Sequence, residues 1–174
     1  MKLNSVLICA ITGILAHAAP SIAETPADMP QNALTLEAKL APVEKYHKEW
    51  QSDYAGYAEF DCTVKNVSNK TIWIGTETAD FVINWSTDNP NINTPRWPIL
   101  ANLPYGIRLD PGQTYSRAIP LLFGQMKAGD SVTFHLLFHS NPGGALRRIP
   151  QPVPDKNTMP DLIASCSIKF TVPK

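Results

Sequence analysis

The sequence has no excess of charge of either sign and very little cysteine. Its 174 residues carry 15 Lys+Arg against 15 Asp+Glu, with three cysteines. A balanced charge gives no electrostatic reason to expect nucleic acid or an anionic membrane surface as a partner. The length suits one ordinary domain, which buries a core without a metal or several disulfides. The 44% hydrophobic content is too high for a wholly disordered chain.

Long apolar runs and long helical patterns are also missing from most of the chain. After residue 23, no stretch approaches the roughly 18 apolar residues of a membrane helix, so we expect no membrane insertion of the mature protein. The 16 prolines argue against a helical bundle. No internal repeat is visible.

Residues 1–23 have the layout of a secretory signal peptide. Lys2 gives a positive start, an apolar stretch follows, and the small residues Ser21 and Ala23 precede a predicted cut. An uncleaved anchor is the alternative. The signal predicts a periplasmic or secreted protein, with residues 24–32 as a flexible, proline-bearing lead-in.

The remaining residues, 33–174, predict a single β-domain. Apolar and polar side chains alternate with period two in several short segments, which is the pattern of half-buried strands. The segment 66–70 is turn-like and predicts a hairpin between the strands on either side of it. The expected strands cover residues 34–40, 59–65, 71–74, 81–85, 115–122, 132–138 and 164–172.

Two long proline-rich loops, at 87–106 and 140–161, separate these segments. About seven to eight short amphipathic strands without a long helix predict an all-β fold. We expect an antiparallel two-sheet sandwich of the immunoglobulin-like kind, with a barrel or jelly roll as the alternative.

Cleavage of the signal would leave two cysteines, Cys62 and Cys166. A cysteine pair in an oxidising compartment most simply forms a disulfide, and the alternation places both side chains on inward faces. The bridge would close a loop of about 100 residues, which the chain-entropy model values at about 4–5 kcal/mol. Two buried free thiols are the alternative.

No set of residues assembles a recognisable catalytic or metal site. His135 and His139 lie on a predicted strand, where four residues span roughly 13 Å, too far for one metal ion. Ser131 follows a turn and lacks the Gly-x-Ser-x-Gly elbow of a hydrolase. Phosphate-binding and dinucleotide-binding glycine motifs are absent. We therefore expect no enzyme, no metal and no cofactor.

The two proline-rich loops are the best candidates for a binding surface. Prolines keep a loop extended and lower the entropy lost on binding. Arg96 and Trp97 lie in the first loop, and Arg147 and Arg148 lie in the second. Arginine and tryptophan are typical anchors of protein interfaces. A solvated insertion is the alternative for the second loop.

The sequence thus predicts an exported, non-enzymatic binding protein of the cell envelope that recognises a protein partner. Three alternatives stay open. The first is an inhibitor or immunity-type protein that neutralises an envelope-acting enzyme or toxin. The second is a carbohydrate-binding module, which would need exposed Trp73 and Trp97. The third is a hydrolase whose site the sequence hides. Three glycosylation sequons, at Asn66, Asn69 and Asn84, would matter only in a eukaryotic secretory route.

Overall fold

The computed structural model describes residues 32–41, 54–77, 81–95, 103–124, 126–127, 129–150 and 153–171, with the backbone only for 54–56 and 81. These ranges are mostly antiparallel β-structure, as the alternation predicts. The predicted signal peptide lies outside them. The elements are β1 (Leu34–Leu40), β2 (Tyr54–Asn66), β3 (Ile72–Glu77), the 3-10 helix η3 (Phe81–Asn84), β4 (Trp85–Thr87), β5 (Ile92–Asn93), β6 (Pro104–Leu109), β7 (Thr114–Gly124), β8 (Ser131–His139), the 3-10 helix η4 (Pro142–Arg148) and β9 (Ile163–Thr171).

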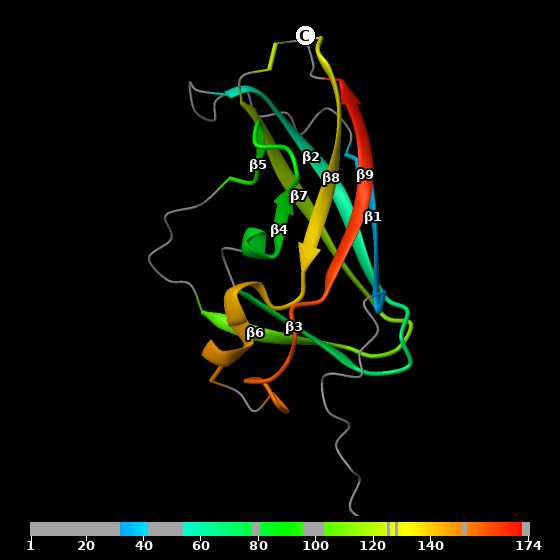
Figure 1. The fold of residues 1–174 in the computed structure, drawn as a ribbon, viewed down its shortest axis with the longest axis vertical. Coiled ribbons are helices and arrows are strands. Elements are labelled where there is room, and N and C mark those ends of the chain that lie inside the picture. Colours follow the sequence, from blue (N-terminus) through cyan, green and yellow to red (C-terminus); the bar gives the residue numbers. More distant parts are fainter. Residues whose placement is uncertain are drawn as a thin grey trace, which may run out of the picture.

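Three groups of hydrogen-bonded strands make up the described fold. One sheet has the order β1-β2-β7-β5, a second has the order β4-β8-β9, and β3 pairs with β6. In Figure 1, β8 and β9 pass in front of β2 and β7, and the β3–β6 pair lies below them beside η4. The first strand, β1, lies against the last strand, β9, at one margin of the two sheets.

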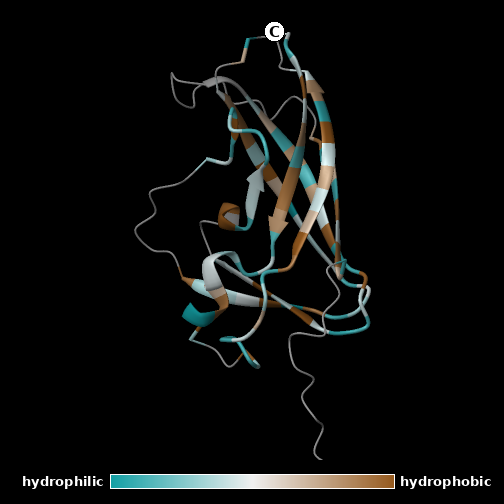
Figure 2. Cartoon of the chain, in the orientation of Figure 1, coloured by the Kyte–Doolittle hydropathy of each residue, from teal (hydrophilic) through white to brown (hydrophobic). Residues whose placement is uncertain are grey.

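Aromatic side chains join the two larger sheets. Phe60 on β2 meets Phe134 on β8 with ring centroids 6.5 Å apart, and it meets Phe170 on β9 at 5.7 Å. Phe123 on β7 stacks on Phe170 at 4.7 Å. Figure 2 shows the alternation of hydrophobic and hydrophilic residues along these strands. The inner faces therefore share one apolar core, which contributes most of the free energy of folding.

The strands with the clearest alternation are confirmed. β1, β8 and β9 begin and end within one residue of the predicted segments. Most of their inward positions are buried or half-buried, as period two requires, but Leu40 at the end of β1 is 50% exposed. The inward parity of Cys62 and Cys166 is confirmed, because Cys62 is buried in the core and Cys166 is half-buried and packs against it.

The predicted hairpin around residues 66–70 is wrong. β2 pairs with β1 and β7, while β3 pairs with β6. The buried side chain of Asn66 explains the change of sheet. Its Nδ2 donates to the carbonyl of Lys70 at 2.7 Å and to that of Leu109 at 2.8 Å. These bonds hold the β2–β3 connection against the end of β6. β3 therefore pairs with β6 and does not join the sheet that contains β2.

The predicted strand at 81–85 is also wrong for most of its length. Residues 81–84 form η3, and β4 begins only at Trp85. Neighbouring residues Asn84 and Trp85 are both buried, which a half-buried strand does not allow. Asn84 Nδ2 donates to the carbonyls of Gly75 and His139 at 2.8 and 2.7 Å, and this tether favours the tighter turn.

Both proline-rich loops contain more structure than predicted. The first includes β5 and the start of β6. The second includes η4 and a small apolar core of its own, made of Leu146, Ile149 and Val153, against which Trp73 and Met159 pack. The loop at 140–161, expected to be extended, therefore contains a packed segment that covers the second face of β3, and the alternative of a solvated insertion does not describe it.

No helix in the described ranges is both long enough and apolar enough to cross a membrane.

Candidate functional site

Arg147 and Arg148, two of the predicted binding residues, close η4. Arg148 Nη1 lies 2.9 Å from Oε1 of Glu77, whose side chain is 12% exposed against 56% for Arg148. Arg147 Nη2 donates to the backbone carbonyl of Asn157 at 3.3 Å. Among the described residues, one contact ties each guanidinium, and a guanidinium has further N–H donors that a ligand could use.

The segment that carries these arginines is fixed by Asn141. Its Oδ1 accepts the N–H of Leu146 at 2.9 Å, and its Nδ2 donates to the carbonyl of Met159 at 2.9 Å. Gly143 and Gly144 have φ of 55° and 72°, a region that favours glycine and lets η4 turn sharply. Because Asn141 is buried, these bonds hold both ends of the segment rigidly.

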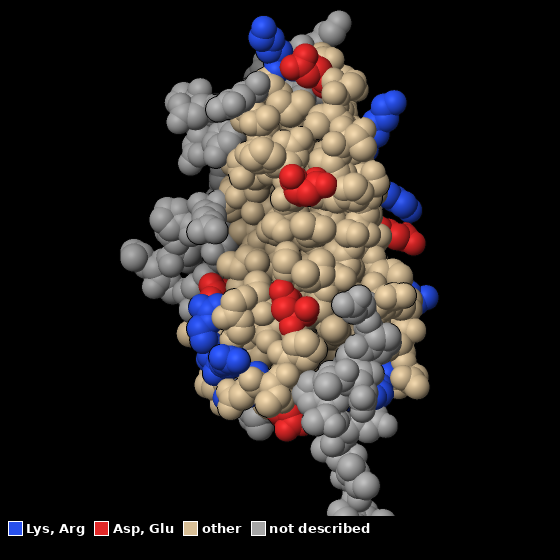
Figure 3. All heavy atoms as spheres, in the orientation of Figure 1, with Lys and Arg blue, Asp and Glu red and all other residues tan. Residues whose placement is uncertain are grey.

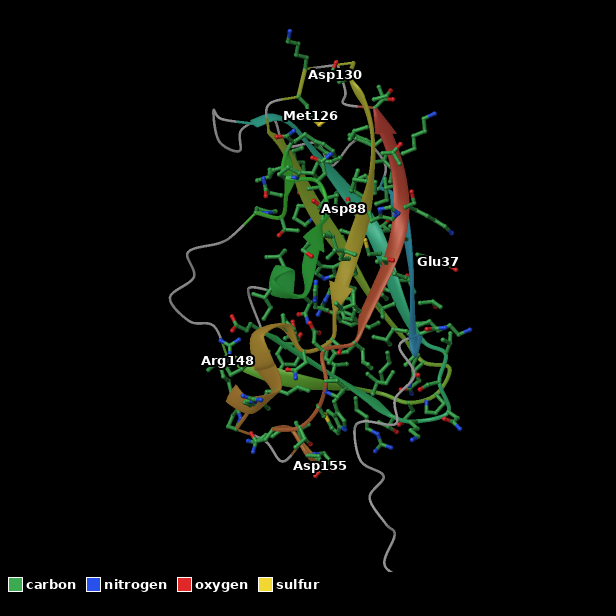
Figure 4. All side chains as sticks on the ribbon, in the orientation of Figure 1. Glu37, Asp88, Met126, Asp130, Arg148 and Asp155 are labelled. Atoms are coloured by element: carbon green, nitrogen blue, oxygen red, sulfur yellow. The ribbon has the colours of Figure 1, made fainter. Side chains whose placement is uncertain are left out.

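A third cation, Lys156, lies in the same segment and donates from Nζ to the carbonyl of Ile149 at 3.0 Å. We call Arg147, Arg148 and Lys156 the basic end. Figure 3 shows Lys and Arg side chains gathered at this end of the molecule, and Figure 4 places Arg148 on η4 with Asp155 below it. Arg96 and Trp97, the predicted partners from the first loop, lie outside the described residues.

A second cluster lies on the outer face of the β4-β8-β9 sheet. Ser86 Oγ on β4 is 3.2 Å from Nε2 of His139 on β8. The other ring nitrogen, Nδ1, is 2.8 Å from Oδ2 of Asp161, just before β9. His139 and Asp161 are 24% and 31% exposed, so the cluster is partly desolvated yet open to solution. We call these three residues the Ser–His–Asp row.

The same face carries another histidine–aspartate pair. Asp88 accepts the backbone N–H of His135 at 2.8 Å and pairs with its Nδ1 at 2.7 Å. Both hydrogen bonds lower the pKa of Asp88, and the bond from the backbone N–H of His135 has the larger effect. Figure 4 shows Asp88 beside β8. The ring of His135 bonds to Asp88 alone within the described part of the chain, so this pair includes no serine.

The sequence does not predict the Ser–His–Asp row, because it places His139 only on a predicted strand, too far from His135 to share a metal ion. Ser86 and Asp161 are 53 and 22 residues away from His139, and only the pairing of β4 and β9 with β8 brings them together. No short motif signals such a meeting. Ser131, the serine that was considered, instead shares a hydrogen bond of 2.9 Å with Thr171.

The two cysteines are present as thiols. Burial, followed by the charges of Cys166 and Asp61, raises the pKa of Cys62 to about 12. Burial also raises the pKa of Cys166. Neither thiol is therefore an activated nucleophile near neutral pH. The predicted disulfide stays a prediction.

Other predicted features are located as follows. The described residues contain no group of three or more His, Cys, Asp or Glu side chains that could hold a metal ion. Trp73 packs against the small core below η4, so it is not an open platform for a sugar. Asn66 and Asn84 are fully buried, so the folded protein cannot carry a glycan on either.

No family model matches the sequence. A search of curated proteins also finds no match.

Proposed function

We propose that the chain is an exported, immunoglobulin-like β-sandwich that binds an acidic protein partner in the cell envelope through its basic end. The strand orders support the fold: β1-β2-β7-β5 and β4-β8-β9 correspond to the ABED and CFG sheets of the constant-type immunoglobulin sandwich. The export follows from the predicted signal peptide. The proposed role is binding of a partner and includes no catalytic step.

The observation that carries the binding proposal is the rigidity of the segment that displays the arginines. Its apolar core lies on β3 and β6, and Asn141 clamps both of its ends. A preorganised surface loses little entropy on association. The remaining guanidinium donors match carboxylates in planar, bidentate geometry, which is why the partner should be acidic.

The test is a pull-down from the native envelope fraction with purified wild-type protein and with Arg147→Ala/Arg148→Ala. Loss of a partner that wild type captures would support the basic end. Lys127→Ala is the matched control, because Lys127 is an exposed cation in the turn between β7 and β8. Equal capture by the double variant would refute the assignment.

The same experiment separates binding from inhibition. A captured partner with enzymatic activity that falls stoichiometrically as the protein is added would identify the chain as an inhibitor. A captured partner whose activity is unaffected would identify a simple binding module.

A further inference from the structure

We propose that Ser86 is a catalytic nucleophile activated by His139 and Asp161, and that it hydrolyses short-chain carboxylic esters. This activity is independent of the basic end. A catalytic triad is a serine hydrogen-bonded to a histidine that is in turn hydrogen-bonded to an aspartate. It is recognised by this geometry and not by the order of the three residues along the chain. Here Ser86 lies on β4, His139 ends β8, and Asp161 lies two residues before the start of β9.

The contacts of His139 determine which nitrogen of its imidazole carries the proton. An ionised carboxylate only accepts hydrogen bonds, so Asp161 Oδ2, at 2.8 Å, holds the proton on Nδ1 of His139. The lone pair of Nε2 then faces the hydroxyl of Ser86 at 3.2 Å. That is the arrangement in which an imidazole acts as a general base toward a serine.

The row is also held in place by its surroundings. The second carboxylate oxygen, Oδ1 of Asp161, accepts the N–H of Asn141 at 2.7 Å. Asn84, two residues before Ser86, donates to the carbonyl of His139 at 2.7 Å. Both bonds fix backbone or carboxylate positions from outside the row, and such preorganisation is what orientation-dependent catalysis requires.

The neighbours of the row indicate the acyl group. Leu137 lies directly opposite Ser86 in the β4–β8 register, and Ile163, which is 50% exposed, lies opposite His139 in the β8–β9 register. Directly opposite residues share a face, so one apolar side chain flanks the Ser86 nucleophile and another flanks the imidazole of His139. The part of Figure 3 that looks onto this sheet is mostly uncharged. A short, uncharged acyl chain fits this open surface.

The reaction balances without a cofactor. Ser86 Oγ bonds to the ester carbonyl carbon while its proton passes to Nε2 of His139. The bond to the alcohol oxygen breaks, and His139 returns the proton to that oxygen. Water, deprotonated by His139, then attacks the acyl-Ser86, and the acid leaves as the serine regains its proton.

The full-length protein is treated with a fluorophosphonate probe and assayed with p-nitrophenyl acetate and butyrate. We expect covalent labelling at Ser86, found by peptide mass spectrometry. Ser86→Ala should abolish both labelling and hydrolysis. His139→Gln should lower both by about 10²–10⁴-fold, the usual contribution of a general base.

Two controls separate catalysis from folding. Ser131→Ala removes an exposed serine that bonds only to Thr171 in the described structure, and His135→Gln breaks the pair without a serine; both should react like wild type. Circular dichroism and urea unfolding should show Ser86→Ala to be folded. Labelling at another residue, no labelling of folded wild type, or full hydrolysis by Ser86→Ala would each overturn the proposal.

Discussion

Gly75, on β3, leaves almost no space between β3 and η4. A Cβ there would lie 2.9 Å from the backbone nitrogen of Leu146 and 3.0 Å from its Cγ. A backbone atom cannot rotate away, so Gly75→Ala must displace η4. We expect a loss of about 1–3 kcal/mol, the usual cost of overpacking, measured by urea unfolding.

Gly106 provides the matched control for that substitution. A Cβ there would meet only side-chain atoms, with Val153 Cγ2 at 3.2 Å and Trp73 Cε3 at 3.3 Å. These groups can move by a few tenths of an ångström, so Gly106→Ala should cost less than Gly75→Ala. Equal losses would contradict the close approach of η4 to β3.

The thiol of Cys62 predicts how the reduced protein responds to alkali. Burial raises its pKa to about 12 from an ordinary value of 9.0, so the unfolded chain loses this proton first. Stability is therefore complete below pH 9 and falls as the pH rises from there toward 12. At pH 10 the free energy of unfolding should be about 1 kcal/mol lower than below pH 9.

Urea unfolding of the reduced protein at pH 8, 9 and 10 measures this effect. The range stays at or below 10 because the pKa values of Tyr57 and Tyr115 are also raised from 10.0, chiefly by burial. Cys62→Ala should weaken the dependence on pH. A wild-type midpoint that is constant across the series would show that the thiol titrates normally.

At the scale of the elements, the position of the segment around η4 depends on the side chain of Asn141. Asn141→Ala would leave the buried N–H of Leu146 without its partner, at about 1–3 kcal/mol, and would also free the part-buried carbonyl of Met159 at a smaller cost. We expect faster amide hydrogen exchange over residues 142–150, with β8 and β9 little changed. Such local opening is what a segment with its own small core allows.

Asn157→Ala is the control for this element. Asn157 is exposed and contributes its backbone carbonyl, which the substitution keeps, to Arg147. Its exchange pattern should match wild type. An Asn141→Ala protein with unchanged exchange over η4 would contradict the clamp.

The sequence predicts some of these elements well and others poorly, for physical reasons. β1, β8 and β9 are covered on one face, so their alternation is readable. β3 is covered on both faces, by the main core and by η4, so its sequence shows no clear alternation of apolar and polar residues. η3 and the exit of β3 toward β6 depend on hydrogen bonds of Asn84 and Asn66 to distant carbonyls. The Ser–His–Asp row depends on strand register in the same way.

At the scale of the whole molecule, oxidation should join the two sheets. Cys62 faces inward from β2 and Cys166 from β9, and the two thiols are close enough that one affects the pKa of the other. We expect the protein isolated from an oxidising compartment to contain this disulfide. Its reduction should lower the free energy of unfolding by about 4–5 kcal/mol.

Thiol titration in denaturant and urea unfolding with and without reductant test this prediction. Cys166→Ser should show the same stability in both conditions, because it cannot form the bridge. Two reactive thiols in unreduced protein isolated from an oxidising compartment, or no effect of reductant on wild type, would contradict it.

The contact between β1 and β9 has a consequence for the order of events during biosynthesis. Phe170, near the end of β9, supplies rings for both Phe60 and Phe123, so the core lacks a central member until almost every described residue has been made. β2 likewise pairs with β7, whose partner residues lie between 49 and 70 positions downstream, from the Lys65–Thr114 pair to the Tyr54–Gly124 pair. Because these contacts join distant parts of the sequence, the described core can form only after most of the chain has been synthesised, as expected for a fold of high contact order.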